Sequence, residues 1–370
     1  MANECCGWCL QPSVGHRPIV FRTRPAQAGR PGGETALAML QPTSFPTRAG
    51  PAVHPRMPLE VVLNAASGKH GKGEVEARLQ ALLAAAGVPH RFHVARRPRH
   101  LVERVAAAAE AAQRGGGALV VAGGDGTINT VAAQAWRRGL PLGVLPQGTF
   151  NYFGRAHGLS QTLDEACETL LAGLREGRVQ PVQAGLLNDQ LFLVNASLGL
   201  YPQVLQDREA FKQRYGRSRL VAAWAALRTA LKPHRELLLR LQVGDAPERA
   251  VRTPTLFVGN NPLQMERLGL PEAERVGHGD FAVLTLAPIG RLALLKLALL
   301  GALGQLGEAD GVHHSTEPAL WVEPAGSARR RPVRVALDGE TRWMAPPLHF
   351  EVAAEPLWLL GGQPTATRER

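Results

Sequence analysis

The stretch Ala118-Leu119-Val120-Val121-Ala122-Gly123-Gly124-Asp125-Gly126-Thr127 joins an apolar run to a glycine-rich turn. A continuous apolar run is typical of a strand buried on both faces of a parallel sheet. Helical spacing follows over 128–137, and the start of a helix presents free N–H groups to phosphate. Glycines would let the turn take positive φ angles and approach a ligand closely. The stretch therefore predicts a phosphate site, where Asp125 holds Mg²⁺ or a ribose hydroxyl and Thr127 offers its hydroxyl to phosphate.

Apolar strands and amphipathic helices alternate on both sides of this stretch. The expected strands are 59–63, 90–94, 118–122 and 142–145. The expected helices are 74–86, 101–113, 128–137 and 163–174. Such alternation predicts a parallel α/β layer, which places ligands at the carboxyl ends of its strands. Three polar turns containing glycine would converge there: 64–68, 123–127 and 146–153.

The pattern changes near Pro181, where strands begin to follow one another. These strands are expected at 190–195, 237–243, 255–259, 281–286, 319–322 and 333–337. Helices at 218–231 and 291–304 interrupt them, and 348–352 and 357–360 close the chain. We therefore predict an α/β domain over 58–182, to which 348–362 return, and a mostly antiparallel β domain over 183–347. Residues 363–370 would be a tail without a fold.

The first 57 residues are rich in Pro, Gly, Arg and Thr and show no periodicity. Such composition predicts a segment without a fold, or an extension upstream of a true start at Met57. The chain has four cysteines, too few for a disulfide framework, which favours a reducing cytosol. We recognise neither a signal peptide nor an uncharged apolar stretch of transmembrane length.

The formal net charge of +11 indicates an anionic partner, such as a nucleotide, an anionic lipid surface or nucleic acid. Nucleic acid is the least favoured of these, because aromatic residues are only 5% and no stacking motif occurs. The basic cluster at 91–100 is interpreted as a solvated face. The apolar stretches 218–231 and 289–306 could lie on a membrane, although core helices explain the same pattern.

Six sequence segments share one order and spacing with a known family. They are NAASG (64–68), GGDGTIN (123–129), PQGTFNYFGRAHGL (146–159), NASLGL (195–200), VGNN (258–261) and LDGE (337–340). From about Leu59 to Leu360 the chain resembles the diacylglycerol kinase catalytic-domain family, which includes bacterial lipid kinases and sphingosine kinases. The resemblance implies an N-terminal α/β domain of the kind found in NAD kinases and phosphofructokinases. It also implies a C-terminal β-sandwich, a cleft between the domains that holds the active site, and a last strand that returns to the first domain.

The resemblance further implies roles for individual residues. ATP contacts would come from Asn64, Ser67, Gly68 and Glu340, and the cleft lining from Gly148, Thr149 and Asn151. The ATP phosphates and Mg²⁺ would bind to Gly123, Gly124, Asp125, Gly126 and Thr127. Asp338 would be the general base that takes the proton of the acceptor hydroxyl. From the residues alone, Asp338-Gly339-Glu340 is an acidic turn between strands.

The sequence departs from the family pattern at four places. Thr130 and Tyr152 stand where the family usually has acids, and Gln183-Ala184 and His278-Gly279 replace segments that usually contain Asp. In relatives the Asp replaced at 278 helps to hold a structural Mg²⁺, so that site is in question. The nucleotide side of the pattern is better preserved than the acceptor side, so the acceptor is left open.

The favoured hypothesis is an ATP-dependent lipid kinase that transfers the γ-phosphate to a hydroxyl of a diacylglycerol-like or other lipid. An NAD kinase also carries GGDGT but has an Asn-Glu pair where this chain reads Val194-Asn195-Ala196-Ser197. A non-catalytic nucleotide- or lipid-binding regulator is the other alternative. The expected partners are ATP, Mg²⁺ and a lipid acceptor. A homodimer is left open, as is peripheral contact of a cytoplasmic protein with the inner membrane face.

Overall fold

The computed structural model describes residues 50–65, 73–148, 150–200, 202, 236–244, 246–302, 304–326 and 331–362. Ordered structure is present before the boundary expected at residue 57. Met57 is buried, and Val53 packs against the same apolar core. The boundary predicted from composition is therefore too late, because apolar residues within a Pro-rich segment still pack against the first sheet.

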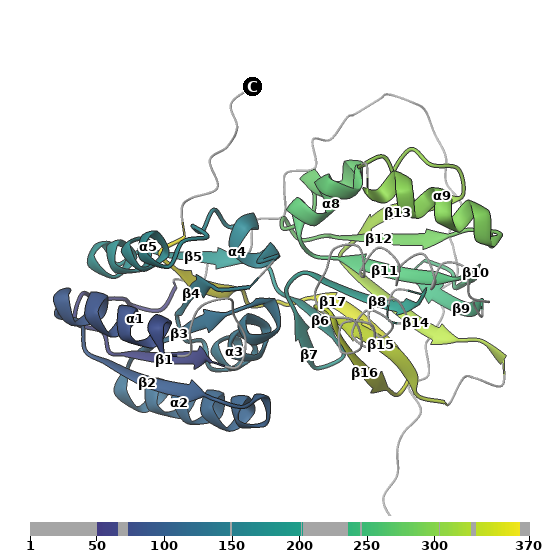
Figure 1. The fold of residues 1–370 in the computed structure, drawn as a ribbon. Coiled ribbons are helices and arrows are strands. Elements are labelled where there is room, and N and C mark those ends of the chain that lie inside the picture. The colour runs from purple at the N-terminus through teal and green to yellow at the C-terminus, as the bar shows by residue number, and fades with distance from the viewer. Residues whose placement is uncertain are drawn as a thin grey trace, which may run out of the picture. The chain divides into compact units, whose positions relative to one another are not determined.

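The first sheet has the strand order β2-β1-β3-β4-β18-β5 (Figure 1). Its strands are β1 (Leu59–Asn64), β2 (His90–Ala95), β3 (Ala118–Gly123), β4 (Leu142–Pro146), β5 (Val179–Val182) and β18 (Leu357–Leu360). β1 to β4 are parallel, β18 is parallel to β4, and β5 is antiparallel to β18. The prediction of a parallel α/β layer is confirmed.

Successive side chains of a strand point to opposite faces of the sheet. The strands β1, β3 and β4 are buried along almost their whole length, and helices cover both faces of this sheet. The helices of this domain are α1 (Glu74–Ala85), η1 (Pro98–His100), α2 (Leu101–Gly115), α3 (Asp125–Arg138), α4 (Tyr152–Ala156) and α5 (Leu163–Glu176). Val120 of β3 lies in one core with residues of α1 and α5, whereas Val121 lies in the other core with residues of α2 and α3. Two separate apolar cores therefore hold the glycine turn between β3 and α3.

The remaining strands form two antiparallel sheets. The first, in the order β10-β9-β14-β17-β6-β7, contains β6 (Gly185–Leu187), β7 (Gln190–Phe192), β9 (Leu237–Gln242), β10 (Arg249–Thr253), β14 (Ala319–Pro324) and β17 (Leu348–Val352). The second, in the order β13-β12-β11-β8-β15-β16, contains β8 (Asn195–Gly199), β11 (Thr255–Gly259), β12 (Phe281–Leu286), β13 (Val312–Glu317), β15 (Val333–Leu337) and β16 (Glu340–Met344).

These two sheets share one core and form the expected β-sandwich. Phe192 and Phe350 of one sheet lie in the same cluster as Phe281 and Val335 of the other. A further apolar cluster lies beneath three helical elements, α8 (Pro262–Leu268), η2 (Pro271–Glu274) and α9 (Arg291–Ala302). α9 agrees with the helix expected at 291–304, and the helix expected at 218–231 lies outside the described residues.

Two strand predictions are corrected. Leu348–Val352 pairs with β14 and β6 in the sandwich, so only β18 returns to the first sheet. The alternating pattern of this strand places Leu348 and Phe350 in the sandwich core. Local sequence could not show which sheet the strand joins. The single strand expected at 190–195 is two strands, because the chain turns at 193–194 between β7 and β8.

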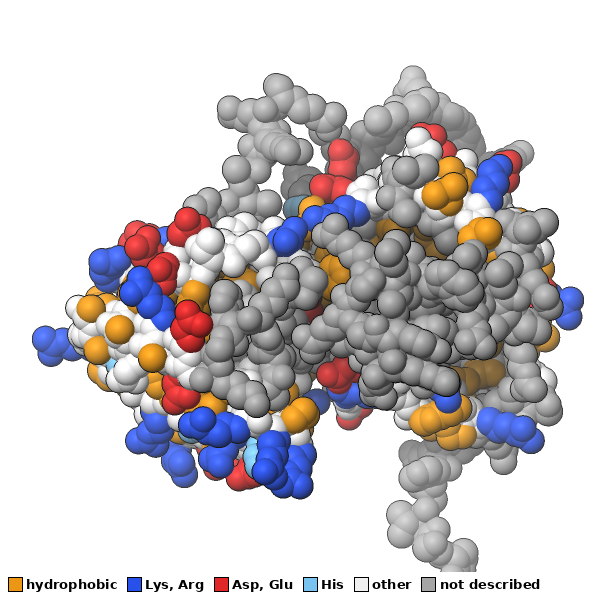
Figure 2. All heavy atoms as spheres, in the orientation of Figure 1, with side chains coloured by type: hydrophobic (Ala, Val, Ile, Leu, Met, Phe, Trp, Pro, Cys, Tyr) orange, Lys and Arg blue, Asp and Glu red, His pale blue; other side chains and the backbone are white. Residues whose placement is uncertain are grey.

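Figure 2 shows Lys and Arg side chains gathered over the part of the molecule where β2 and α2 lie in Figure 1. Within the basic cluster Arg91, Arg96, Arg97 and Arg99 are exposed, as expected of a solvated face. His93 and His100 are half-buried, and Nε2 of His93 lies 2.6 Å from Oε2 of the buried Glu60. None of the described helices combines the length and apolarity that a membrane span requires.

Candidate functional site

The glycine turn passes directly from β3 into α3. Gly124 caps the helix with φ −88° and ψ 177°, and none of the described residues at 123–127 has a positive φ. The expectation that these glycines take positive φ angles was therefore wrong. Close approach is the reason for glycine instead, because a Cβ on Gly123 would lie 2.7 Å from Cβ of Thr127.

A second close approach joins the glycine turn to the loop after β4. A Cβ on Gly148 would lie 2.8 Å from Cα of Gly124 and 2.6 Å from Oδ1 of Asn151. The N–H of Gln147 donates to the carbonyl of Gly123 at 2.8 Å. Two of the three turns that were expected to converge are therefore in backbone contact.

Asn151 gives the second loop its shape. It is buried with a left-handed φ of 48°, its Oδ1 accepts from the N–H of Gly148 at 2.8 Å, and its Nδ2 donates to Oε1 of Gln161 at 2.8 Å. Phe150 and Tyr152 beside it have parallel rings with centroids 5.8 Å apart. The amide of Asn151 is thus engaged within the protein.

A side-chain hydrogen bond connects the described part of the third turn to the glycine turn. Nδ2 of Asn64, at the end of β1, donates to Oγ1 of Thr127 at 2.9 Å. Thr127 is buried in the first turn of α3, so its hydroxyl is engaged within the protein. Ser67, Gly68 and Thr149 lie outside the described residues.

Asp125 points toward the start of α4. Its Oδ1 accepts from the N–H of Phe153 at 3.4 Å. Burial raises the pKa of the Asp125 carboxyl, and backbone N–H groups at 151–153 act in the opposite direction. This hydrogen bond connects the glycine turn to the second loop. Among the described residues no cluster of three or more His, Cys, Asp or Glu side chains forms a metal site.

Asp338 occupies the tip of the β15–β16 hairpin with a left-handed φ of 47°. Its Oδ1 accepts from the N–H groups of Val194 (2.8 Å) and Asn195 (3.0 Å), and its Oδ2 accepts from the N–H of Leu193 and from Nδ2 of Asn129, both at 2.7 Å. Burial raises the pKa of the carboxyl to about 6, although these hydrogen bonds lower it. An ionised carboxylate has about four acceptor positions, so all of them are occupied.

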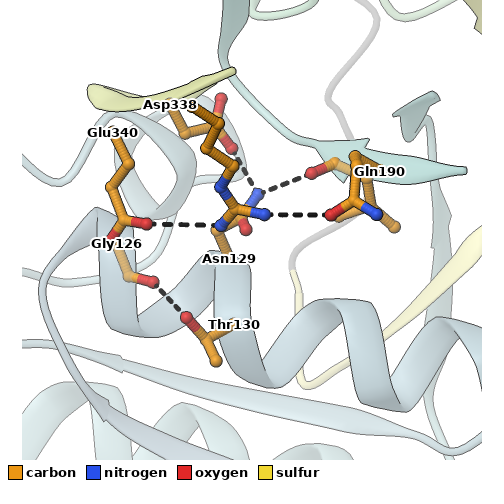
Figure 3. Close-up of polar contacts among 8 residues, drawn as sticks. Gly126, Asn129, Thr130, Gln190, Asp338 and Glu340 are labelled. Atoms are coloured by element: carbon orange, nitrogen blue, oxygen red, sulfur yellow. Dashed lines mark hydrogen bonds and ion pairs between the residues drawn. The ribbon is translucent and has the colours of Figure 1, made fainter. Parts of the chain in front are cut away.

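Glu340 and two residues that carried no sequence expectation complete this region (Figure 3). Oε1 of Glu340 lies 3.1 Å from the position of a Cβ on Gly126. Arg342 donates through Nη1 to Oε1 of Gln190 at 2.9 Å and through Nη2 to Oε2 of Glu340 at 3.3 Å. No local sequence signal marks Arg342 or Gln190, because their strands β16 and β7 belong to different sheets.

Thr130 and Gln183, two of the departures from the family pattern, also have defined partners. Oγ1 of Thr130 donates to the carbonyl of Gly126 within α3 at 2.9 Å, a local bond that an acid could not make. The buried Gln183 accepts at Oε1 from the N–H of Gly279 at 2.7 Å. Its Nε2 donates to Oδ1 of Asn260 at 2.7 Å and to the carbonyl of Asp280 at 3.0 Å. The side-chain amide of Gln183 therefore forms direct hydrogen bonds with the backbone of residues 279 and 280.

The fold and the site together define a two-domain protein in which a parallel α/β domain with a GGDGT turn precedes an antiparallel β-sandwich. Residues 58–184 match the family model described as the diacylglycerol kinase catalytic domain. This part of the chain, about a third of its length, is similar to that family.

Curated relatives agree with the family over a limited length. A probable lipid kinase YegS-like of Serratia proteamaculans is 37% identical over 94 residues, which are 24% of this chain and 30% of that protein. A diacylglycerol kinase of Bacillus subtilis is 38% identical over 104 residues, which are 27% of this chain and 33% of that protein. These matches therefore span about a third of the relatives' length.

A solved structure matches most of the chain. A putative diacylglycerol kinase from Bacillus anthracis has a TM-score of 0.63, with 18% sequence identity over 84% of this chain and 98% of that one. At this identity the likeness shows the fold, including the β-sandwich beyond residue 184.

Proposed function

We propose that this protein is an ATP-dependent lipid kinase that transfers the γ-phosphate to a hydroxyl of a diacylglycerol-like or other lipid acceptor. The observation that carries the proposal is the hydrogen bond between Asn129, in the helix after the glycine turn, and Asp338. This hydrogen bond joins the helix after the glycine turn, which is suited to binding phosphate, to a carboxylate that can accept a proton. The names of the matched relatives support a kinase of this family.

In this proposal the phosphates bind at the start of α3, where N–H groups and the helix dipole favour anions. Phosphoryl transfer needs positioning and charge neutralisation more than covalent help from the protein. Asp125 is the carboxylate of the glycine turn and is the proposed Mg²⁺ ligand. The Mg²⁺ would neutralise charge on the phosphates. Gly124 and Gly148 lie so close together that a Cβ on Gly148 would clash with Gly124. Both positions are glycine, so no Cβ atom occupies this part of the site.

Asp338 is the proposed general base. Its raised pKa makes it a stronger base than an ordinary carboxylate while it stays ionised at neutral pH. Three of its four donors are backbone N–H groups, and the fourth is the side-chain amide of Asn129. The acceptor hydroxyl would take the place of the Asn129 amide, because that donor is the one on a rotatable side chain.

The four hydrogen bonds to the Asp338 carboxylate also favour a second candidate, a non-catalytic nucleotide- or lipid-binding regulator. A carboxylate with four donors is also what a structural role would require, since Asp338 holds the turn between β7 and β8. The two candidates differ in whether the bound nucleotide is consumed.

The test uses γ-labelled ATP, Mg²⁺ and a total lipid extract in detergent micelles, with products separated by thin-layer chromatography. We expect a labelled lipid from the wild-type protein and none from Asp338→Asn that is shown to be folded by circular dichroism. The matched control is Asp164→Asn, which removes an exposed carboxylate that pairs with Arg78. ATP binding without any labelled lipid would favour the regulator, and labelled lipid from a folded Asp338→Asn would exclude Asp338 as the base.

A further inference from the structure

Arg342 is held by two acceptors from different strands. Its guanidinium donates to Oε1 of Gln190 on β7 and to Oε2 of Glu340 on its own strand, β16 (Figure 3). The Arg342 side chain is 42% exposed, so a solute can reach it. An arginine has five N–H donors, and among the described residues two of those of Arg342 have acceptors, which leaves donors for an anion.

Glu340 connects the guanidinium of Arg342 to the glycine turn. Glu340 bonds Arg342 through Oε2, while its Oε1 lies 3.1 Å from the position of a Cβ on Gly126. Gly126 is in the first turn of α3, where the helix dipole is positive. The Glu340 carboxylate thus lies between two positive groups, and a nucleotide phosphate is an anion that the same two groups would bind.

The position of Gln190 in the chain, next to Leu191, also indicates which phosphate this is. The neighbouring residue, Leu191, accepts at its carbonyl from Nδ2 of Asn129 at 3.1 Å, and the same amide donates to Asp338. Arg342 is therefore anchored to the group of residues around the proposed base. A base that takes a proton from the acceptor hydroxyl must lie near the phosphorus that this hydroxyl attacks, which is the γ-phosphorus of ATP.

We propose that Arg342 binds the γ-phosphate of ATP and stabilises charge on the phosphoryl group during transfer, with Gln190 positioning the guanidinium. The proposal rests on the kinase function proposed above. In the transfer, the hydroxyl oxygen of the acceptor bonds to the γ-phosphorus and the bond from the γ-phosphorus to the bridging oxygen breaks. The electron pair stays on ADP and the hydroxyl proton goes to Asp338. Arg342 gives up no proton, because a guanidinium stays charged at every working pH.

The experiment compares the binding of Mg·ATP and Mg·ADP by titration calorimetry, which requires no lipid acceptor. For Arg342→Gln we expect ATP to bind roughly 10- to 100-fold more weakly, the range for losing hydrogen bonds to a charged group. ADP affinity should stay within about twofold, because ADP lacks the γ-phosphate. Arg342→Lys keeps the charge and should fall between wild type and Arg342→Gln for ATP.

The matched control is Arg334→Gln on the same hairpin, where Arg334 lies over the Trp343 ring at 4.7 Å. This variant should bind both nucleotides as the wild type does. Equal weakening of ATP and ADP in Arg342→Gln, or unchanged ATP affinity, would overturn the role of Arg342 and leave the proposed kinase function standing. A wild-type protein that binds no ATP would overturn the proposed kinase function itself, and the role of Arg342 with it.

Discussion

Nδ2 of Asn129 donates to Oδ2 of Asp338 at 2.7 Å, across a separation of 209 residues. Asn129 follows the glycine turn within α3, and Asp338 forms the tip of a hairpin in the β-sandwich. The bond therefore connects the two halves of the proposed active site through a pair of side chains. Its length is short for an N–H···O hydrogen bond, as expected when the acceptor is ionised.

Asp338→Asn should destabilise the protein. Asn has one side-chain oxygen, so its NH₂ group would face two of the four donors that now bind the carboxylate. We expect the free energy of unfolding to fall by about 2–4 kcal/mol, measured by urea denaturation, because buried donors lose their partner. Asp164→Asn should leave the free energy of unfolding nearly unchanged, since its ion pair with Arg78 is exposed. Equal losses in the two variants would contradict the described coordination of Asp338.

The proposed kinase activity should depend on pH through Asp338. Its pKa is raised to about 6, so the carboxyl is protonated below that pH and cannot accept a proton. We expect kcat/KM for the lipid acceptor to be constant above about pH 7 and to fall about tenfold per pH unit well below pH 6. A rate that stays constant down to pH 4.5 would mean that the group in use has an ordinary carboxyl pKa.

Gly148→Ala should disrupt the contact between the two loops. The new Cβ would lie 2.8 Å from Cα of Gly124, which is backbone and cannot rotate away. We expect a loss of about 1–3 kcal/mol in the free energy of unfolding, with weaker ATP binding. Gly115→Ala at the end of α2 is the control, because its Cβ would meet nothing within 4 Å. A Gly148→Ala variant as stable as Gly115→Ala would show that the loops can separate at little cost.

Gln183→Glu should be strongly destabilising at neutral pH. Its second oxygen would replace the NH₂ group that donates to Asn260 and Asp280, leaving a buried charge that faces two acceptors. We expect a loss of about 3 kcal/mol or more by thermal or urea unfolding, and a smaller loss at lower pH where a protonated carboxyl can donate. Gln134→Glu on α3 is the control, because Oε1 of Gln134 already accepts from Arg138. A tolerated Gln183→Glu would indicate that a cation or water compensates the charge.

Local sequence was sufficient for the order of strands and helices in the first domain. The apolar run at 118–122 became a buried strand, and the helix followed the glycine turn as expected. It was not sufficient for Leu348–Val352, whose alternating pattern fits either sheet, or for the turn at 193–194. Alternation reports that a strand is half-buried, not which sheet buries it.

The sequence by itself determined the strand, the glycine turn and the helix, because these depend on neighbouring residues and on the absence of Cβ atoms at 123, 124 and 126. Only the tertiary structure decided why Gly124 and Gly126 are needed, since their close contacts are with Gly148 and Glu340 on distant segments. It also decided the coordination of Asp338 and placed Arg342 beside Glu340 and Gln190. Contacts of this kind join residues that are distant along the chain, so no local pattern contains them, and they form only when the two sheets of the sandwich and the parallel sheet have packed.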